Sequence, residues 1–418
     1  MPISFASRGR GIRSHVRFME KENRPGKTSK APALAVIGAG PGGLHAAIAA
    51  ARRGMKVVLF EKGDVGDRIV CGECIFDSLG MLPPPDAGRL YEVRTILISA
   101  RGAYRLPIGN YRRLWMVDRR TWQRQLAAQA AVLGVDVRCG EKITPAGVGE
   151  LVSRYDWVID ASGAPSVTSR AYGFAGEYRR RPPLLAYQYT VAGDFSALFS
   201  AATIKVGFLS RAPAECLPGY YWIFPKSSGV ANVGVVFTRG GEDGFSLDLK
   251  GLLTEIMGRE SLHPERVLRK GGGLIPTCML PRLVYGRIVL VGDAAGLTSP
   301  LHGGGIDLAW LSGVRAVEAI SKGKHGVGSY RRGLLSLMKH KLSLEEMVIA
   351  KMKTLPFTDF DDLLHAAAVH RAGIRTKVGL RHPGLLAAAW LWLKARRPPA
   401  VIAYETHMTI RRHNGDEK

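Results

Sequence analysis

The sequence is poor in acidic residues and in cysteine. Its 418 residues include 35 Asp or Glu against 59 Lys or Arg, which gives a formal net charge of +24. The five cysteines are odd in number and show no spacing typical of a disulfide framework, so they indicate a reducing, cytoplasmic setting. The sequence contains no apolar run long enough to span a bilayer, no internal repeat and no four-cysteine run for an iron–sulfur cluster.

Both ends of the chain contribute to the excess of positive charge. Residues 1–30 carry eight Lys or Arg against two Glu and lack the apolar core of a secretory signal, which predicts a basic disordered arm. The short apolar run 384–393 includes Trp390 and Trp392 and is followed by Lys394, Arg396 and Arg397. This run fits either a helix lying in an anionic membrane interface or a buried core helix. No nucleic-acid-binding module is present, so we expect no nucleic-acid partner.

A glycine-rich turn at residues 34–43, LAVIGAGPGG, is the most informative motif of the chain. It reads as a buried strand that runs into glycines and then into an Ala-rich helix. Such a turn binds a dinucleotide, because glycines permit the tight turn, the approach of a pyrophosphate and the packing of helix on strand. We therefore assign cofactor binding to Gly38, Gly40, Gly42 and Gly43.

Two acidic residues follow strands at the positions that cofactor riboses require. Glu61 ends a second strand, residues 56–60, at the distance expected for a carboxylate that binds ribose hydroxyls. Asp293 ends a remote strand in the motif VGDAAG, where it would suit the ribityl chain of FAD, although Asp there also commonly caps a helix. A glycine run at residues 303–305 then precedes another helix. The first residues of that helix, Gly305 and Ile306, would face the flavin or its pyrophosphate.

Further motifs resemble the geranylgeranyl reductase family of FAD enzymes, within the glutathione-reductase-like class. The matching segments are GAGPGG at 38–43, Cys-Gly-Glu at 71–73, Arg119 before Trp122, YYWIFPK at 220–226, Asn-Val-Gly at 232–234, residues 272–276 and residues 292–306. They span residues 34 to about 330. Cys74 departs from the family, which often has Gly there, and both ends of the chain match nothing in it.

The resemblance implies further cofactor contacts. The loop of Cys71, Gly72 and Cys74 would lie along the flavin, with its backbone in contact with FAD. Arg119 would reach toward the FAD phosphates, and Ile143 would lie against the adenine. The alternative without a cofactor contact is that Arg119 is a surface arginine of a basic protein and Ile143 an ordinary core residue.

Cys71 and Cys74 form a Cys-x-x-Cys pair with more than one interpretation. A zinc site would need a second ligand pair, which the sequence lacks, so no metal is expected. A redox-active pair that reacts with flavin is a second possibility, and small apolar fillers of the core are a third. We keep Cys71 as a candidate catalytic residue beside its expected cofactor contact.

An aromatic strand is the candidate substrate site. Alternation puts Tyr220, Trp222 and Phe224 on one face, and in the family this strand lines a tunnel over the flavin, although such a stripe is more often core. His302 lies within the glycine-rich motif and could donate a proton or bind a polar head group, while a structural histidine is the commoner case.

The fold class is α/β: an FAD-binding Rossmann-type domain, glutathione-reductase-like, interrupted by a mostly antiparallel β substrate domain and followed by a helical C-terminal region. We assign residues 31–90, 119–180 and 283–330 to the FAD-binding domain, 91–118 and 181–282 to the substrate domain, and 331–418 to the helical region.

The resemblance implies FAD-dependent reduction of isoprenoid carbon–carbon double bonds in lipids, prenyl pyrophosphates or quinones. Such an apolar substrate, the net charge of +24 and the Trp390/Trp392 run lead us to expect a protein at the surface of an anionic membrane. The electron donor is left open between NAD(P)H and a ferredoxin-like protein, because no second glycine fingerprint is present. The alternatives are a flavin monooxygenase or halogenase of the same fold, a membrane-surface flavoprotein that passes electrons to quinone, and a non-catalytic flavin-dependent binder of DNA or lipid.

Overall fold

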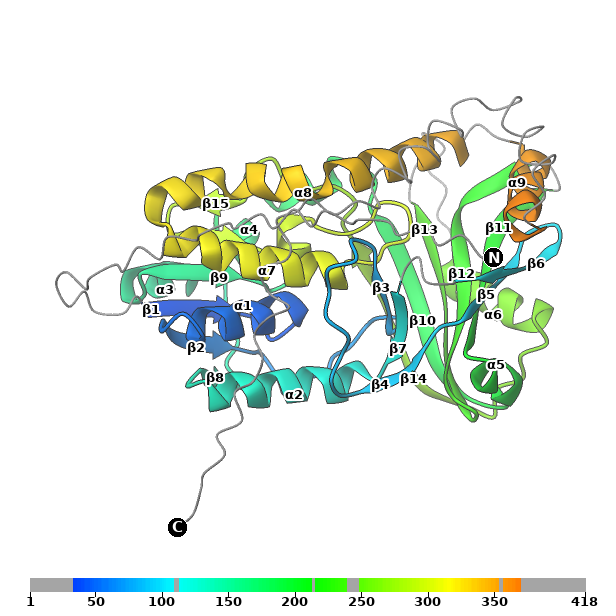
Figure 1. Cartoon of the computed structure of the whole chain (residues 1–418), viewed down its shortest axis with the longest axis horizontal. Coiled ribbons are helices and arrows are strands. Elements are labelled where there is room, and N and C mark those ends of the chain that lie inside the picture. The colour runs from blue at the N-terminus through cyan, green and yellow to red at the C-terminus, as the bar shows by residue number, and fades with distance from the viewer. Residues whose placement is uncertain (1–32, 109–112, 213–214, 239–247, 353–355, 370–418) are drawn as a thin grey trace, which may run out of the picture. The chain divides into compact units, whose positions relative to one another are not determined.

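The computed structural model describes residues 33–108, 113–212, 215–238, 248–352 and 356–369 (Figure 1). The basic arm at residues 1–30 and the Trp390/Trp392 run lie outside these residues. Three sheets and a set of helices make up the described part.

The first sheet is the cofactor-type sheet, and four of its five strand pairings are parallel. Its strand β1 (Ala33–Ile37) is almost fully buried, as expected for a parallel sheet covered on both faces. The order is β15 (Val284–Tyr285), β16 (Ile288–Leu290), β9 (Trp157–Asp160), β1, β2 (Lys56–Phe60) and β8 (Asp136–Arg138).

The second sheet is antiparallel except for one parallel pair, β11 with β5. Its order is β14 (Arg266–Ile275), β10 (Leu184–Ala192), β13 (Val230–Thr238), β12 (Glu215–Ser227), β11 (Thr203–Ala212), β5 (Thr95–Ser99) and β6 (Ala103–Pro107). One face packs on α6 (Leu249–Arg259) through Leu253 and Ile256, and α5 (Ser196–Ser200) lies against β11 and β12. The predicted class, a Rossmann-type unit with a mostly antiparallel β domain and C-terminal helices, is confirmed.

A third, three-stranded sheet was not expected. It consists of β3 (Cys74–Asp77), β7 (Arg113–Val117) and β4 (Arg89–Glu92). Residues 91–118, which the sequence assigns to the substrate domain, therefore divide between two sheets. Alternation in short strands identifies a strand but not its partner, so the sequence could not separate them.

The described residues also form α-helices and two 3-10 helices, of which α2 follows its predicted pattern. Helix α2 (Arg119–Val132) begins at Asp118, whose carboxylate accepts the Thr121 amide at 3.0 Å, and buries Trp122, Leu126 and Ala130 as its periodicity predicts. The remaining helical elements are α1 (Pro41–Ala51), α3 (Val148–Arg154), α4 (Val167–Ala171), η2 (Ala175–Arg179), η3 (Gly292–Ala295), α7 (Ile306–Ser321), α8 (Gly323–Met352) and α9 (Phe357–Val369).

Two glycines of the first turn give a matched test of the fold. A Cβ at Gly43 would overlap the Gly38 carbonyl oxygen, whereas a Cβ at Gly40 would meet no atom within 4 Å. We predict that Gly43→Ala lowers the free energy of unfolding by about 1–3 kcal/mol, because a backbone oxygen cannot give way. Gly40→Ala should stay within about 0.5 kcal/mol of wild type when both proteins are free of FAD. Denaturant titration checks both variants, and equal stabilities would contradict this account of the turn.

Candidate active site

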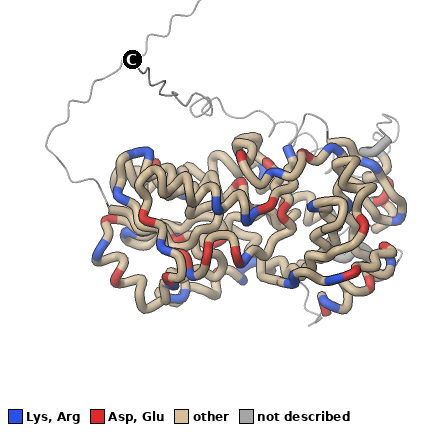
Figure 2. The backbone as a smooth tube through the Cα atoms, turned by 90° about the horizontal axis from the view of Figure 1, so that it is seen from below, with Lys and Arg blue, Asp and Glu red and all other residues tan. Residues whose placement is uncertain are grey.

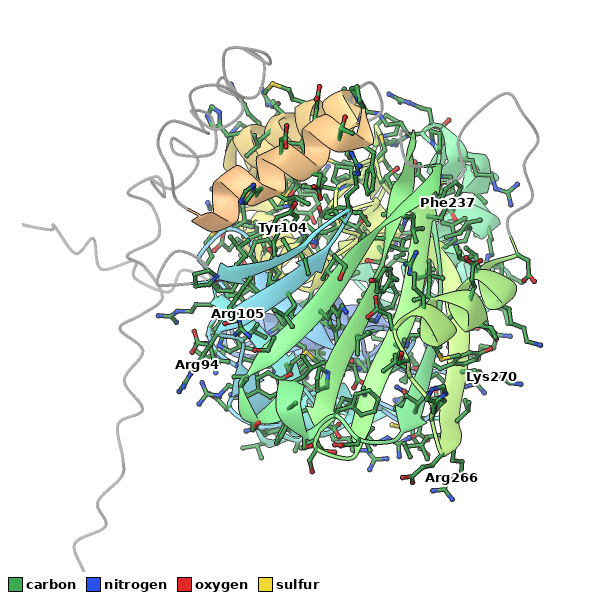
Figure 3. The ribbon with its side chains drawn as sticks, turned by 90° about the vertical axis from the view of Figure 1, so that its right-hand side faces the viewer. Arg94, Tyr104, Arg105, Phe237, Arg266 and Lys270 are labelled. Atoms are coloured by element: carbon green, nitrogen blue, oxygen red, sulfur yellow. The ribbon has the colours of Figure 1, made fainter. Side chains whose placement is uncertain are left out.

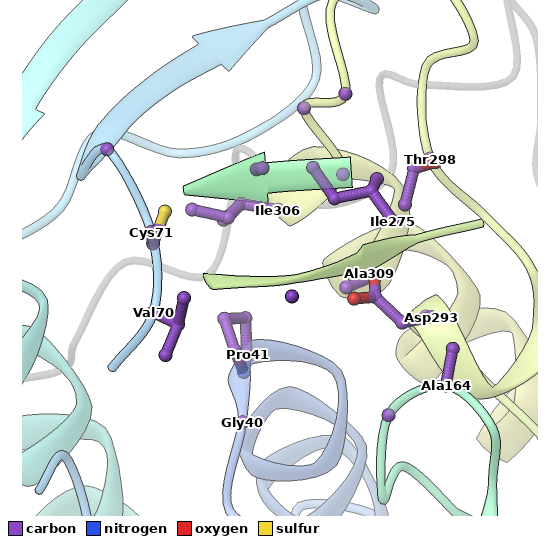
Figure 4. Close-up of a pocket in the computed structure, with 18 of the residues that line it drawn as sticks. Gly40, Pro41, Val70, Cys71, Ala164, Ile275, Asp293, Thr298, Ile306 and Ala309 are labelled. Carbon is purple, nitrogen blue, oxygen red and sulfur yellow. The ribbon is translucent and has the colours of Figure 1, made fainter. Parts of the chain in front are cut away.

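One cavity of about 2140 Å³ extends from the glycine-rich turn to the seven-stranded sheet. A pocket for one small ligand typically measures about 300–1,000 Å³, so this space can hold a large cofactor and a second ligand. Figure 4 shows five of the residues that line this cavity: Gly40 and Pro41 of the glycine-rich turn, Cys71, Ile275 and Asp293.

The glycine-rich turn presents open backbone to this cavity. Gly38 adopts φ +99°, a conformation that side chains rarely tolerate, and it lines the cavity with Gly40 and Gly42. The empty space at the Gly40 Cβ position is the space that a pyrophosphate needs. Gly43 is not part of the lining, and its role is to let the turn pack closely.

Glu61 and Ile143 lie at the same end of the cavity. The Glu61 carboxylate follows β2 and accepts the Ala39 amide of the glycine turn at 2.7 Å. It therefore fixes the turn and still faces the cavity with Ile143. This placement suits the ribose and adenine contacts that the sequence assigned to the two residues.

Asp293 lies in the short helix η3 beyond the carboxyl end of β16. Its side chain opens into the cavity and is otherwise enclosed by protein. This enclosure raises the pKa of the carboxyl, and the positive charge of Arg119 partly offsets the rise. No side-chain cap forms at η3, so Asp293 does not act as its N-cap. A carboxylate in this position can accept hydrogen bonds from sugar hydroxyls.

Arg119 connects α2 to the cofactor end of the cavity. One guanidinium nitrogen donates to Gln123 Oε1 at 2.6 Å, and Gln123 in turn donates to the Ala39 carbonyl at 3.0 Å. The buried Nε of Arg119 has no hydrogen-bond partner within the described ranges. An available cationic donor, an open glycine turn and two cavity-facing carboxylates together fit FAD.

The loop at residues 71–74 crosses from this end to the substrate sheet. The Cys71 carbonyl accepts hydrogen bonds from Gln188 at 3.0 Å and Asn232 at 3.1 Å. A Cβ on Gly72 would lie 3.1 Å from the Phe224 ring, so the loop passes directly under the aromatic strand.

The thiols of this loop are free. Burial, and to a lesser extent the neighbouring Cys71, raises the pKa of Cys74 to about 12, so Cys74 is a neutral thiol at physiological pH. This counts against the redox-active pair, because thiol exchange needs a thiolate. Cys74 lines the cavity with Cys71 and Gly72, so the expected cofactor contact of the three residues stays a prediction. In the part of the chain that the structure describes, no group of three His, Cys, Asp or Glu could hold a metal ion.

The aromatic residues of β12 divide between the two faces of the sheet, as alternation requires. Tyr220, Trp222 and Phe224 line the cavity, while Tyr221 and Ile223 belong to the core under α6. The Trp222 indole donates to Asn232 Oδ1 at 2.7 Å. The pair is only 5% and 0% exposed, respectively, so this hydrogen bond is shielded from water.

Sequence reasoning did not assign roles to the residues that support the aromatic strand. Asn232 links Trp222 to the Cys71 carbonyl, and a Cβ on Gly234 would overlap the Trp222 indole. Both belong to the Asn-Val-Gly motif of β13. A polar residue and a glycine opposite an aromatic strand were the available signal, but their partners appear only once β12 and β13 pair.

Glu73 is a further residue whose role the sequence did not assign. It is 1% exposed and adopts φ +61°, and its carboxylate lies 2.6 Å from Lys226 Nζ and 3.6 Å from an Arg269 nitrogen. The same carboxylate accepts the Arg119 amide at 3.1 Å. Buried charge is tolerated only when it is paired and hydrogen-bonded, and Glu73 meets both conditions.

Comparisons with known proteins agree with this geometry. The model of the pyridine nucleotide-disulphide oxidoreductase family matches residues 32–184. A digeranylgeranylglycerophospholipid reductase of Methanopyrus kandleri is 31% identical over 321 residues, which cover 69% of this chain and 81% of the relative. One of Methanothrix thermoacetophila is 27% identical over 371 residues, which cover 80% and 90%.

The chain belongs to the geranylgeranyl reductase family. It is an FAD-dependent oxidoreductase. Its fold resembles a solved geranylgeranyl bacteriochlorophyll reductase-like protein of Thermoplasma acidophilum, with a TM-score of 0.66, 22% identity and coverage of 86% of this chain and 99% of the other. A flavin-dependent brominase shares the fold at a TM-score of 0.63 and 19% identity, with coverage of 89% and 97%.

In this reductase His302 lies in the glycine-rich segment before α7, where Gly305 and Ile306 also line the cavity. Its Nδ1 accepts the Gly304 amide at 3.1 Å, and its Nε2 lies 3.7 Å from Glu345 Oε1 on α8. Because the Nδ1 lone pair is engaged, a proton exchanged by this ring passes through Nε2. Glu345 itself is paired with the buried Lys341 at 2.7 Å.

The raised pKa of Asp293 gives a pH-dependent prediction. A carboxyl whose folded pKa exceeds its unfolded value of about 3.8–3.9 stabilises the fold only while protonated, and this stability is lost as the pH rises through the folded pKa. Asp293→Asn should therefore raise the melting temperature of FAD-free protein at neutral pH, with a smaller difference near about pH 4. Calorimetry at both pH values measures this.

The same variant should weaken FAD binding by about tenfold or more, the expected effect of losing a hydrogen bond to a charged acceptor. Equilibrium dialysis of FAD provides the check. Unchanged affinity for FAD in Asp293→Asn would remove Asp293 from the cofactor site.

Proposed function

We propose that this reductase saturates carbon–carbon double bonds of isoprenoid chains, such as the geranylgeranyl groups of lipids, prenyl pyrophosphates or quinones. The single observation that carries the proposal is one cavity with two different ends. Its cofactor end is polar and contains Glu61, Arg119 and Asp293, and it continues past Trp222 into a chamber with apolar walls. A polar substrate would find few partners in that chamber, whereas a long hydrocarbon chain would bury its surface there.

The names of the relatives support the same substrate class, because they are reductases of digeranylgeranylglycerophospholipids. FAD, when bound, supplies the hydride. The chain's own residues hold the alkene against the cofactor, exclude water and supply a proton. Tyr220, Trp222 and Phe224 would orient the isoprenoid, and His302 and Cys71 are the candidate proton donors.

The electron source belongs to the proposal as well. We infer that either NAD(P)H or a ferredoxin-like protein reduces the flavin. Stopped-flow reduction of the flavin by each donor distinguishes the two.

Trp222 gives the prediction that tests the substrate site. Trp222→Ala should abolish most reduction of geranylgeranyl chains while FAD binding stays near wild type. Its control is Ile223→Ala, the next residue of β12 on the opposite face. Both variants create a core cavity that costs about 2–5 kcal/mol of stability, so a purely structural role would make them alike.

Mass spectrometry of lipids provides the measurement, in cells that express wild type, each variant or no protein. Wild type and Ile223→Ala should yield chains with added hydrogen, and Trp222→Ala should not. Oxygenated or halogenated products, or substrate-dependent oxygen consumption, would instead favour a monooxygenase or halogenase. Loss of flavin in Trp222→Ala would show that Trp222 is only core.

Peripheral membrane association is part of the proposal, because the proposed substrates include membrane lipids. No helix within the described ranges is long and apolar enough to cross a bilayer. Figure 2 shows Lys and Arg interspersed with Asp and Glu over the described backbone. Part of the positive excess lies in segments outside the described residues, since residues 370–418 carry ten Lys or Arg against three Asp or Glu.

We predict that the protein sediments with vesicles of anionic phospholipid at low salt and dissociates as salt is added, because exposed charges are screened. Replacement of both Trp390 and Trp392 by Ala should remove this binding and leave a yellow, folded protein. Vesicle sedimentation with neutral lipid as the control measures both effects. Wild-type protein that ignores anionic vesicles would contradict the hypothesis.

A further inference from the structure

The apolar end of the cavity is built from elements far from the cofactor. Beyond Phe224, strands β5, β6 and β11 and helices α8 and α9 supply the walls. Representative lining side chains are Ile96, Leu106, Val206, Phe208, Ile349 and Leu364. None of these six side chains carries a charge or a hydrogen-bonding group, so together they offer a ligand apolar contact.

Helix α9 contributes Leu364 to this end of the cavity and is attached to the hairpin of β5 and β6. The Asp361 carboxylate accepts the backbone amides of Arg101 and Gly102, each at 3.0 Å, through one oxygen. Its other oxygen accepts the Tyr104 hydroxyl at 2.7 Å. The Tyr104 ring also stacks on His365, with 5.8 Å between the ring centroids. Figure 3 shows Tyr104 directly beneath α9.

The hairpin to which α9 is attached lies at the edge of the seven-stranded sheet, far from the cofactor turn. Strand β6 is the last strand of the seven-stranded sheet, so no further strand of that sheet extends the wall beyond it. Figure 1 places β6 and α9 at the opposite end of the described unit from β1 and β2, which carry the cofactor turn. Leu364 lies one turn after Asp361 on α9 and faces the cavity.

We propose that α9 is the end wall of the chain-binding chamber and that Leu364, held in place by Asp361, sets how many isoprene units fit beyond the reactive double bond. The inference rests on the proposed function, since it concerns the same isoprenoid site. It adds a specificity-determining residue and a positioning residue in a helix distant from the cofactor motifs.

Binding of prenyl alcohols of increasing length tests the proposal. The probes are geraniol, farnesol and geranylgeraniol, titrated by calorimetry into the full-length, FAD-loaded protein. Affinity of the wild type should rise with each added unit, because each unit buries more apolar surface. Leu364→Trp fills the end of the chamber and should weaken geranylgeraniol by about tenfold or more, while geraniol stays within about twofold. The matched control is Thr358→Trp, at an exposed position of the same helix.

A second variant tests the same proposal without introducing a tryptophan that could misfold the helix locally. Asp361→Ala removes the carboxylate that fixes α9, and it should also weaken geranylgeraniol selectively without loss of FAD. Asp362→Ala, at the neighbouring exposed position, should bind all three alcohols like wild type. If Leu364→Trp and Asp361→Ala leave geranylgeraniol binding unchanged, or weaken the three alcohols equally, α9 is not the end wall.

Failure of this inference can be told apart from failure of the proposed function. Length-dependent binding that Leu364→Trp shortens, without any reduction of the chain, would uphold the end wall and reject the reductase substrate. Reduction of geranylgeraniol with equal turnover in Leu364→Trp would do the reverse. A wild-type protein that binds none of the alcohols would overturn both.

Discussion

The buried carboxylate of Glu73 is the interaction on which the arrangement of the cavity depends. It pairs with Lys226 at the end of β12 and with Arg269 on β14, and it accepts the amide that begins α2. These partners come from the substrate sheet and from the cofactor side, so one side chain joins the two. Removal of either cation would leave a buried charge underpaired, which is costly, and the loop at residues 71–74 would lose its position.

The same loop divides the cavity into two chemical environments. On one side, open glycine backbone, Glu61, Arg119 and Asp293 can meet the phosphates and sugars of FAD. On the other, Trp222 and apolar side chains line the cavity, and they would exclude water from the double bond of the proposed substrate. The network from Trp222 through Asn232 to the Cys71 carbonyl connects the environments, so the aromatic strand and the loop are positioned together. Orientation and a dry site are the contributions that a protein makes when a cofactor carries the redox step.

Much of the cofactor end was predictable because its signals are local. The glycines at 38–43 and the acids Glu61 and Asp293 each follow a strand at a fixed distance, and alternation correctly divided the faces of β12. The supporting contacts were not predictable, because they join distant segments: Glu73 to Lys226 across 153 residues and Tyr104 to Asp361 across 257. The division of residues 91–118 between two sheets was missed for the same reason, since strand partners are set by tertiary packing.

Anaerobic single turnover tests the central claim most directly. Purified protein with its flavin chemically reduced is mixed with geranylgeraniol in the absence of oxygen, and flavin absorbance and product mass are followed together. The account predicts that the oxidised flavin spectrum returns as the alcohol gains a pair of hydrogens, with one pair gained per flavin oxidised. Flavin that stays reduced until oxygen is admitted, with unchanged or oxygenated alcohol, would contradict it.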